Sequence, residues 1–365
     1  MLSEAEVVRA VLGSHSLERA EKFVDEVFWR TYWKGWLEHR PAVWTRYRQD
    51  LQRALQQMAG DDRTALLYQA AVAGGTGIDV FDAWARELQE TGYLHNHARM
   101  WFASIWIFTL DLPWTAGADL FLRHLLDGDP ASNTLSWRWV AGLHTSGRPY
   151  LARPENIARY LGVPPARPEL LAPRASALTE DAPLPPPGLQ LPSPSTPRGR
   201  VGLLLTEEDL TLEDLPAAVC SVMGVALPAA RSPLAVSAAV RGFARDAVSD
   251  AGGRASRRLG VPYEGTWDDA GSCGRSCGRD AAPAAAIVDW ASRHRLDTVV
   301  TAYAPVGPAA DLLAELETSL ADAGVQLTRQ VRQWDRQCWP QTTGGFFRLK
   351  KQIPALLAQL GVAAA

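Results

Sequence analysis

A proline-rich stretch divides this chain and constrains its fold more than any other feature. Residues 163–199 include the strings GVPPARPELLAPR and APLPPPGLQLPSPSTPRGR. Proline fixes its own backbone and lacks an amide hydrogen, so neither a regular helix nor a central strand can be sustained there. We therefore expect an extended, solvated linker. The sequence predicts two folded regions on either side of it, over residues 1–162 and 200–365.

The two regions differ in periodicity. Residues 1–160 carry apolar side chains at helical spacing almost throughout. Beyond the linker, short β-rich runs alternate with helical stretches. The β-rich runs cover residues 201–205, 217–225, 298–303 and 326–331, and the helical stretches cover 236–250, 283–294, 308–324 and 347–361. This alternation predicts βαβ units, and hence an all-helical domain followed by a Rossmann-like α/β domain with a mostly parallel sheet.

The charge balance offers no general attraction to nucleic acid. Lys and Arg number 37 against 40 Asp and Glu, and residues 1–162 alone hold 17 basic and 19 acidic side chains. Any contact with DNA must therefore come from a local basic patch. A hydrophobic content of 47% with 21% charged residues is ordinary for a globular protein and excludes an intrinsically disordered one.

The sequence favours a cytoplasmic protein that does not associate with membranes. The first residues, MLSEAEVVRA, are acidic where a secretory signal would be basic. The longest apolar run, Met100–Leu110, has eleven residues and is too short to cross a bilayer. The presence of only four cysteines favours a reducing compartment. No oligomeric state is predicted.

Two candidate metal motifs fail on their spacing. Cys273 and Cys277 form a CxxxC string, which is not the spacing of a zinc or iron–sulfur site. Asp127 and Asp129 would open a calcium-binding loop of the EF-hand type, but serine and arginine take the places of its central glycine and last glutamate. We predict no bound metal.

Chemically mixed side chains share one stripe of a predicted helix. In EKFVDEVFWRTYWKGW, Phe23, Glu26, Trp29 and Arg30 fall at spacings of three and four, so they lie on one face. Two charges on such a face need partners. Either Glu26 and Arg30 pair with each other on an ordinary amphipathic helix, or the cluster serves a functional site.

Two further clusters follow along the chain. One occupies a single helix face after a glycine-containing turn and consists of Asn96, Arg99 and Met100. The other crowds a loop that enters the next helix and consists of Asp127, Asp129 and Asn133, followed within that helix by Trp137 and Trp139. For the carboxylates, the alternative to a binding site is a helix N-cap in a solvated acidic turn.

The ordered set of these motifs resembles the FAD-binding helical domain of the DNA photolyase/cryptochrome family. The pattern is ExxWR, then TG followed by D and REL, then TGxxHNxxRM, then DGDxxxNxxSWxWVAG, over roughly residues 20–160. Each piece is weak alone, but their order is specific. The resemblance implies an all-helical FAD-binding domain with site residues like those of the photolyases that repair cyclobutane pyrimidine dimers.

The resemblance implies a binding site for FAD. The residues that match positions holding the U-shaped cofactor are Arg30, Asn96, Arg99, Asp127, Asp129 and Asn133. By this match, Asn96 faces the reactive N5 atom of the flavin. An ion pair between Arg99 and Asp127, buried beside the isoalloxazine ring, is mutually neutralised and leaves hydrogen bonds to tune the reduced flavin.

The resemblance also implies a lesion pocket and an electron relay. The pocket for a flipped-out dimer, in which indoles stack on bases and a carboxyl group binds their edges, matches Glu26, Trp29, Met100 and Trp139. Trp137 and Trp114 match the proximal and middle tryptophans that photoreduce the flavin. The distal donor has no counterpart, and either the relay is shorter or it ends at one of Tyr68, Trp44, Trp101 and Trp106.

The sequence departs from the family pattern in two ways. A TSxLS-type loop, which clamps the FAD diphosphate in the family, has no counterpart ahead of Glu26. In addition, the α/β region follows the helical region, whereas the antenna domain of photolyases precedes it. Residues 296–357 resemble the latter half of such an antenna domain. The alternative is an unrelated Rossmann-like domain, in which no GxGxxG or P-loop string indicates a nucleotide site.

Three functions follow from these features. The leading one is repair of damaged DNA by light-driven electron transfer from FAD to a cyclobutane pyrimidine dimer, which is a deoxyribodipyrimidine photo-lyase activity. The second is a cryptochrome-like blue-light photoreceptor, favoured by the acidic charge balance and the incomplete relay. The third is a helical scaffold without flavin, favoured by the lack of the clamp loop.

Overall fold

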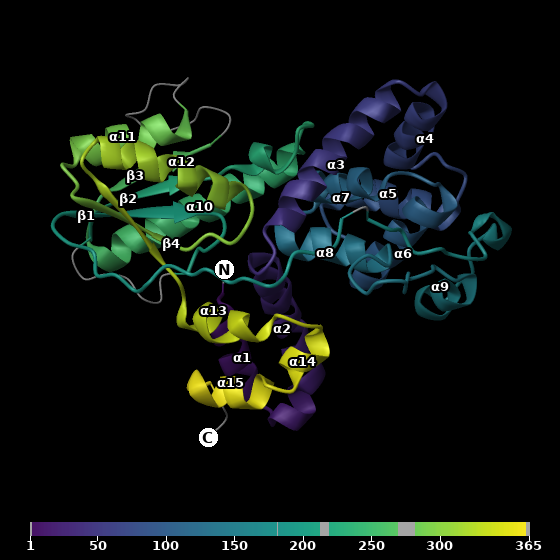
Figure 1. The fold of residues 1–365 in the computed structure, drawn as a ribbon, viewed down its shortest axis with the longest axis horizontal. Coiled ribbons are helices and arrows are strands. Elements are labelled where there is room, and N and C mark those ends of the chain that lie inside the picture. The colour runs from purple at the N-terminus through teal and green to yellow at the C-terminus, as the bar shows by residue number, and fades with distance from the viewer. Residues whose placement is uncertain (1, 181, 212–218, 269–281, 363–365) are drawn as a thin grey trace. The chain divides into compact units, whose positions relative to one another are not determined.

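The computed structural model describes residues 2–180, 182–211, 219–268 and 282–362. The backbone divides by its internal contacts into two compact units, which we describe separately (Figure 1). The helical unit comprises Ala42–Pro185 and Arg231–Arg241, and the α/β unit comprises Met1–Pro41, Pro186–Ala230 and Gly242–Ala365. Cys273 and Cys277 lie outside the described residues.

The helical unit is built around aromatic side chains. Its helices are α3 (Ala42–Ala59), α4 (Asp62–Ala73), α5 (Asp79–Thr91), α6 (Asn96–Ser104), α7 (Trp114–His124), α8 (Pro130–Val140) and α9 (Pro154–Leu161). A π-helical turn, Ile105–Thr109, follows α6. The indoles of Trp101, Trp106 and Trp137 are among the largest fully buried side chains. The high tryptophan content of this region therefore fills its core.

The ends of these helices follow local sequence signals. The side chain of Asp129 accepts a hydrogen bond from the backbone amide of Ser132 and caps α8, and Pro130 takes the first helical position. Gly92 ends α5 in the left-handed conformation, with φ of 68°. Only glycine adopts that conformation without steric strain. The chain then turns into α6, which carries one of the predicted clusters.

The α/β unit contains a parallel sheet with the order β3-β2-β1-β4-β5. Its strands are β1 (Val201–Thr206), β2 (Val219–Val225), β3 (Tyr263–Trp267), β4 (Thr298–Ala302) and β5 (Gln326–Gln330). Its connecting helices are α10 (Ala238–Leu259), α11 (Pro283–Arg293) and α12 (Pro308–Asp322). Alternating side chains of β1 reach opposite faces of the sheet: Leu204 packs in the core formed with α11 and α12, and Leu203 packs in the core formed with α10. The predicted fold class, a helical region and an α/β region with a parallel sheet, is confirmed.

Three details of the α/β region differ from the sequence prediction. The edge strand β3 was not predicted, because its five residues, YEGTW, alternate weakly and contain a glycine. The helix α13 (Gln333–Cys338) was also not predicted. The helix expected over residues 347–361 is instead two, α14 (Phe346–Lys350) and α15 (Ile353–Gln359). Pro354 explains the break, because it lacks an amide hydrogen and its ring clashes with the carbonyl four residues earlier, at Lys350, where α14 ends.

The first two helices belong by their contacts to the α/β unit. They are α1 (Glu4–Leu12) and α2 (Leu17–Glu38), and α1, α13 and α14 all pack on α2. The sequence placed residues 1–162 in one helical domain, so this division differs from the predicted boundary. The physical reason lies in contacts between residues more than 300 positions apart, such as the bond from Trp334 Nε1 to Thr31 Oγ1. The domain boundaries that the sequence predicts at residues 162 and 199 remain predictions.

The first part of the proline-rich stretch is irregular and largely exposed, as expected of a linker, but it is also held to the helical unit at several points. Its backbone is irregular apart from a short turn at Pro168–Leu170. The Leu178 amide donates to the Ala141 carbonyl, and Leu171 is buried. The buried guanidinium of Arg138 forms a two-pronged ion pair with Glu180. Such a fork restrains both partners, which sequence composition alone does not reveal.

We expect Glu180→Ala to lower the free energy of unfolding by about 3 kcal/mol, because it leaves the buried Arg138 charge without its carboxylate. Chemical denaturation followed by tryptophan fluorescence measures this. The matched control is Glu169→Ala in the same stretch, whose pair with Arg167 is exposed on both sides, at 3.7 Å. Such a pair contributes less than about 1 kcal/mol. Equal losses in the two variants would contradict this account of the anchor.

Candidate functional site

In the helical unit, α6 and the loop before α8 are joined by the predicted ion pair. Arg99, one turn into α6, donates from Nε to the Leu94 carbonyl at 2.8 Å and from Nη2 to Asp127 Oδ2 at 2.9 Å. The Arg99 and Asp127 side chains are 25% and 57% exposed. The structure therefore contains the predicted pair, and its burial beside a flavin stays a prediction. An exposed carboxylate there can still accept a hydrogen bond from a ligand.

The two residues that follow Asp127 in this cluster begin α8. Asp129 is the N-cap described above, which is the role that the sequence offered as the alternative to a binding site. Asn133, one turn later, is buried and donates from Nδ2 to the Ala118 carbonyl at 2.8 Å. Asn96 stands exposed at the first position of α6. The structure thus pairs Arg99 with Asp127 and sets Asp129 and Asn133 at one helix start, and their convergence on a cofactor stays a prediction.

Trp137 is buried in an aromatic cluster that includes a second indole. Its ring centroid lies 6.3 Å from that of Trp106, with the planes perpendicular, and 5.1 Å from that of Phe121. A Cβ atom on Gly117 would come within 2.3 Å of the Trp137 ring and 2.9 Å of Trp106 Nε1. Gly117 therefore allows both indoles to approach the same point of α7. The Trp106 ring in turn lies 5.8 Å from that of Tyr68.

Trp114 is surrounded by different groups. Its ring centroid lies 5.7 Å from that of Tyr47, which in turn stacks on Trp44 at 5.2 Å. The Arg138 guanidinium lies 6.0 Å from the Trp114 ring centroid. A nearby positive charge stabilises a neutral indole relative to an oxidised one. Because Arg138 is itself paired with the Glu180 carboxylate, the middle position of Trp114 in an electron relay stays a prediction.

The helical-unit members of the predicted lesion pocket are partly accessible. Met100 and Trp139 are both half-buried. The Trp139 ring stacks on Tyr150 with centroids 5.4 Å apart. Tyr150 therefore already covers one face of this indole.

In the α/β unit, the predicted residues of α2 are engaged by other parts of the unit. Trp29 stacks almost parallel on Phe346 of α14, with ring centroids 3.7 Å apart and planes at 10°. Glu26 is exposed. Partial desolvation, with the neighbouring carboxylate of Asp25, raises the pKa of Glu26. Phe346 thus occupies a stacking face of the very indole assigned to bases.

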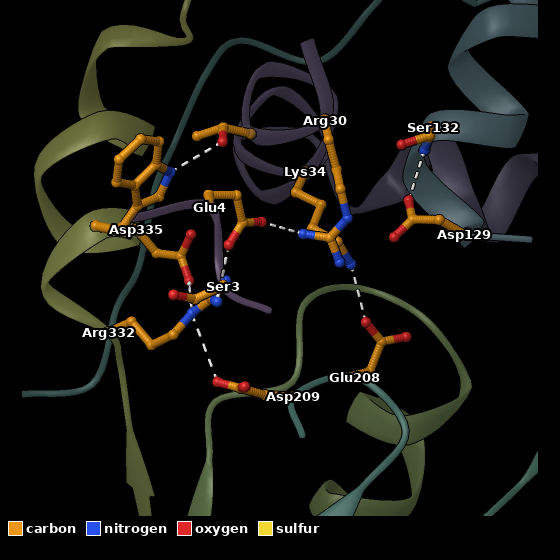
Figure 2. A network of polar contacts seen from close by, with 12 residues as sticks. Ser3, Glu4, Arg30, Lys34, Asp129, Ser132, Glu208, Asp209, Arg332 and Asp335 are labelled. Atoms are coloured by element: carbon orange, nitrogen blue, oxygen red, sulfur yellow. Dashed lines mark hydrogen bonds and ion pairs between the residues drawn. The ribbon is translucent and has the colours of Figure 1, made fainter. Parts of the chain in front are cut away.

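Arg30 is bound into a network of charges (Figure 2). Its guanidinium pairs with Glu4 of α1, and Glu4 also accepts from Arg332, which precedes α13, at 2.9 Å. Arg332 pairs in addition with Asp335 at 3.0 Å and Asp209 at 3.5 Å. Arg30 thus has a carboxylate partner within its own unit, and its role toward FAD stays a prediction.

The charges of this network explain two perturbed carboxyl groups. Burial acts to raise the pKa of Glu4, but the guanidinium groups of Arg30 and Arg332 outweigh it and lower the pKa to about 2. Burial raises the pKa of Asp335 to about 6 despite the attraction of Arg332. The Glu4 carboxylate adds to the effect of burial on Asp335, so Asp335 takes up a proton more readily than Glu4.

Sequence reasoning missed the partners that engage α2. Glu4 lies in a capping box, in which Ser3 and Glu6 bond reciprocally, and this predicts only a helix start. Phe346 follows a Gly-Gly pair and was noted only as part of an antenna-like stretch. Both partners contact α2 across long sequence separations. A single sequence carries no signal for such a pairing.

The comparisons with known proteins agree with the order of the motifs. Residues 23–160 match the family described as the FAD binding domain of DNA photolyase. This part of the chain belongs to the DNA photolyase/cryptochrome family. The cofactor that this family match indicates is FAD. The sequence-based recognition of the family is thereby confirmed.

Relatives of the photolyase-type segment are named deoxyribodipyrimidine photo-lyase. The protein of Streptomyces griseus is 38% identical over 149 residues, which are 40% of this chain and 31% of that protein. A protein of Thermus thermophilus is 39% identical over 133 residues (36% and 31%), and that of Escherichia coli is 33% identical over 136 residues (35% and 26%). The chain thus spans about a third or less of the length of these curated relatives. No solved structure matches it.

Two further observations concern the described residues. No helix among them has the length and apolarity that a bilayer crossing requires. Cys338 is buried, and burial raises the pKa of its thiol far above the usual range. A thiol with a raised pKa is a poor nucleophile.

The raised pKa of Asp335 predicts a pH dependence of stability. Because the folded-state pKa lies near 6 and the ordinary value is 3.8, the folded protein binds this proton more tightly than the unfolded chain. The contribution of Asp335 to stability is therefore present at low pH and is lost as the pH rises from about 4 to 6. The lowered pKa of Glu4 acts oppositely, since its contribution is lost only as the pH falls below 4.5 toward 2.

The variant Asp335→Asn isolates this effect, because it cannot titrate. As the pH rises from about 4.5 to 6, the variant should become more stable relative to the wild type. Above that range, the difference in unfolding free energy between the two should stay level. Urea denaturation at several pH values measures it. A difference that is constant across this window would contradict the assignment.

Proposed function

We propose that this chain is a photolyase-like flavoprotein that binds FAD and acts as a deoxyribodipyrimidine photo-lyase, repairing cyclobutane pyrimidine dimers in damaged DNA with light. The observation that carries the proposal is the family match over residues 23–160, which includes every predicted site residue in order. The names of the relatives support the same activity. The proposed setting is the cytoplasm.

The side chains of the helical unit suit a flavin nucleotide chemically. Asp127 keeps an exposed carboxylate beside the Arg99 guanidinium, and the side-chain amide of Asn96 is exposed at the start of α6. Carboxylate, guanidinium and amide groups together can bind ribityl hydroxyls, phosphate and the polar edge of a flavin. In the proposal, these residues, with Asp129 and Asn133, hold FAD, and Arg30 contributes from α2. FAD supplies the light-absorbing, electron-transferring group.

The electron donors of the proposal come from the aromatic core. Trp137 is the first donor, as its family position implies. Ring contact favours Trp106 as the next one, because it approaches Trp137 in the space left by Gly117. Trp106 lies in the π-helical turn, a feature that often marks functional sites. Tyr68 then continues the relay, because its ring contacts that of Trp106.

The lesion pocket of the proposal combines Met100 and Trp139 with Glu26 and Trp29. Its indoles stack on the flipped bases, and the carboxyl group of Glu26 binds a base edge.

One observation favours a second candidate, a cryptochrome-like photoreceptor. Phe346 stacks on Trp29 and so occupies a face that a base would use. The overall charge of −3 likewise gives no electrostatic drive toward DNA. A photoreceptor needs the flavin and its donors but no lesion pocket, so these features are compatible with it.

The absorption spectrum of the purified full chain tests the flavin itself. Bound FAD should give the flavin bands in the blue and near-ultraviolet, and release of FAD on denaturation identifies the cofactor. Protein that stays colourless after incubation with FAD would refute the proposal. With FAD bound, loss of cyclobutane dimers from irradiated DNA in light but not in darkness separates repair from photoreception.

The variant Trp137→Phe tests the first donor. It should retain flavin and fold with a loss of no more than about 2 kcal/mol, because an aromatic ring still fills most of the site. Photoreduction followed by flavin absorbance should fall sharply, while chemically reduced protein should still repair a dimer. Unchanged photoreduction in flavin-loaded Trp137→Phe would show that another group feeds the flavin.

The variant Trp139→Ala tests the lesion pocket instead of the electron donor. It should spare photoreduction and weaken binding of a dimer-containing oligonucleotide by roughly 1 to 3 kcal/mol, the contribution of one base–aromatic stack. Titration of labelled oligonucleotides with and without the lesion measures this. Equal binding by wild type and variant would remove Trp139 from the lesion pocket.

The variants Trp106→Phe and Trp114→Phe decide the second donor. We expect Trp106→Phe to shorten the lifetime of the light-induced charge separation in transient absorption, because the hole on Trp137 then lacks its indole neighbour. We expect Trp114→Phe to have the smaller effect. The reverse order would assign the relay to Trp114. Gly117→Ala, which would push against both indoles, should resemble Trp106→Phe.

A further inference from the structure

The sheet of the α/β unit reverses its strand order between β1 and β4. From β1 the chain proceeds outward to β2 and β3, and it then returns to place β4 on the other side of β1. In open parallel sheets, the crevice at the carboxyl ends of the two strands at such a reversal is where nucleotide ligands bind. The side chains at this crevice therefore determine whether the unit can hold a nucleotide.

The segment after β1 is unsuited to phosphate. It reads TEEDL, without the glycines that let a backbone approach a diphosphate. Glu207 accepts a hydrogen bond from the Leu227 amide, just beyond β2, at 2.6 Å. Glu208 and Asp209 add two more carboxylates next to β1. Carboxylates offer an anion no favourable charge, and the cations near these two are already paired with them.

Helix α2 occupies the crevice with two charged side chains. Lys34 Nζ lies 2.8 Å from Glu208 Oε2 beyond β1, and the two side chains are only 4% and 12% exposed. Glu38, one turn later, accepts a hydrogen bond from the Tyr303 hydroxyl beyond β4 at 2.6 Å and another from the Val306 amide at 2.5 Å. Consecutive turns of one helix thus engage the ends of both strands at the reversal.

The Glu38 carboxylate also takes the place that an anionic ligand would need. Val306 lies in the loop that leads from β4 into α12, and Glu38 accepts from its amide. Amides at such a loop, ahead of a helix N-terminus, are the usual partners of a bound phosphate. Burial raises the pKa of Glu38, while the bonds from Tyr303 and Val306 act to lower it.

We propose that the crevice at the strand reversal is an internal docking site for helix α2, with Lys34 and Glu38 as its anchors, and not a site for a nucleotide or a nucleotide-like second chromophore. The antenna-like region then acts as a positioning unit. It holds α2, which carries Glu26, Trp29 and Arg30. This inference stands independently of the proposed repair function.

A cavity of about 240 Å³ in this unit lies beside the docking site. Its floor is apolar and includes Leu203 and Val300, on the sheet face toward α10. Its cationic residues are already engaged: Arg329 and Arg332 pair with carboxylates, and Arg336 donates to the Pro192 carbonyl at 3.0 Å. It therefore does not present a ready site for phosphates.

Hydrogen exchange of the full chain, resolved by peptide, tests the docking. Removing the buried carboxylate in Glu38→Ala should raise exchange over residues 31–38 by about tenfold or more, since two hydrogen bonds to a charged group are lost. Tyr303→Phe should have a smaller effect, because the Val306 bond remains. The control Glu18→Ala, an exposed glutamate of the same helix, should leave exchange over residues 31–38 unchanged.

Unchanged exchange over residues 31–38 in Glu38→Ala would overturn the docking. Should that variant fail to fold, Glu38→Gln keeps the shape and the Val306 bond but loses the charge. We expect an intermediate increase in its exchange, and no increase would count equally against the proposal.

A second measurement tests the exclusion of nucleotides on the wild-type protein. FMN and inorganic pyrophosphate are added separately during hydrogen exchange. We expect no protection of residues 206–209 or 303–308 by either probe. Saturable protection of these residues would overturn the proposal. FAD bound elsewhere would appear in the absorption spectrum and in other peptides, so failure of this inference is distinguishable from failure of the proposed function.

Discussion

The ion pairs around Arg332 hold together parts of the α/β unit that are distant in sequence. Arg332 and Glu4 are 328 positions apart, and their contact joins the start of α1 to the end of β5. Buried charges are tolerated only when each has a partner, so Arg332 is the member whose loss would affect most of this network. Helix α2 also reaches the network, because Arg30 of α2 pairs with the same Glu4.

The elements that the sequence predicted are those whose patterns are local. The strands β1, β4 and β5 and the helices α11 and α12 were placed within about two residues, because each is an uninterrupted apolar run or a periodic segment. The strand β3 was missed, since its stability comes from pairing with β2 rather than from its own pattern. The membership of α2 could not be predicted either, because it is decided by Glu4, Tyr303 and Trp334 across the chain.

In the candidate site, too, the sequence predicted the features that depend on nearby residues and missed those that depend on distant ones. The order of the motifs led to the family and to the pair of Arg99 with Asp127, because both are properties of nearby residues on adjoining elements. The N-cap role of Asp129 was foreseen as an alternative. The stacking of Phe346 on Trp29 was not, because a Gly-Gly-Phe-Phe string does not specify which distant indole it meets. Sequence reasoning therefore identified the site residues but not the groups that cover them.

The network leaves Arg30 as its most replaceable member. Its side chain is 42% exposed, whereas that of Glu4 is 9% exposed and keeps a second partner in Arg332. If Arg30 turned toward another anion, Glu4 would remain paired and would not become an uncompensated buried charge. Removal of Arg332 instead would leave Glu4, Asp209 and Asp335 without their shared cation. The contact between Arg30 and Glu4 is therefore compatible with a cofactor role for Arg30, because Arg332, rather than Arg30, stabilises the unit.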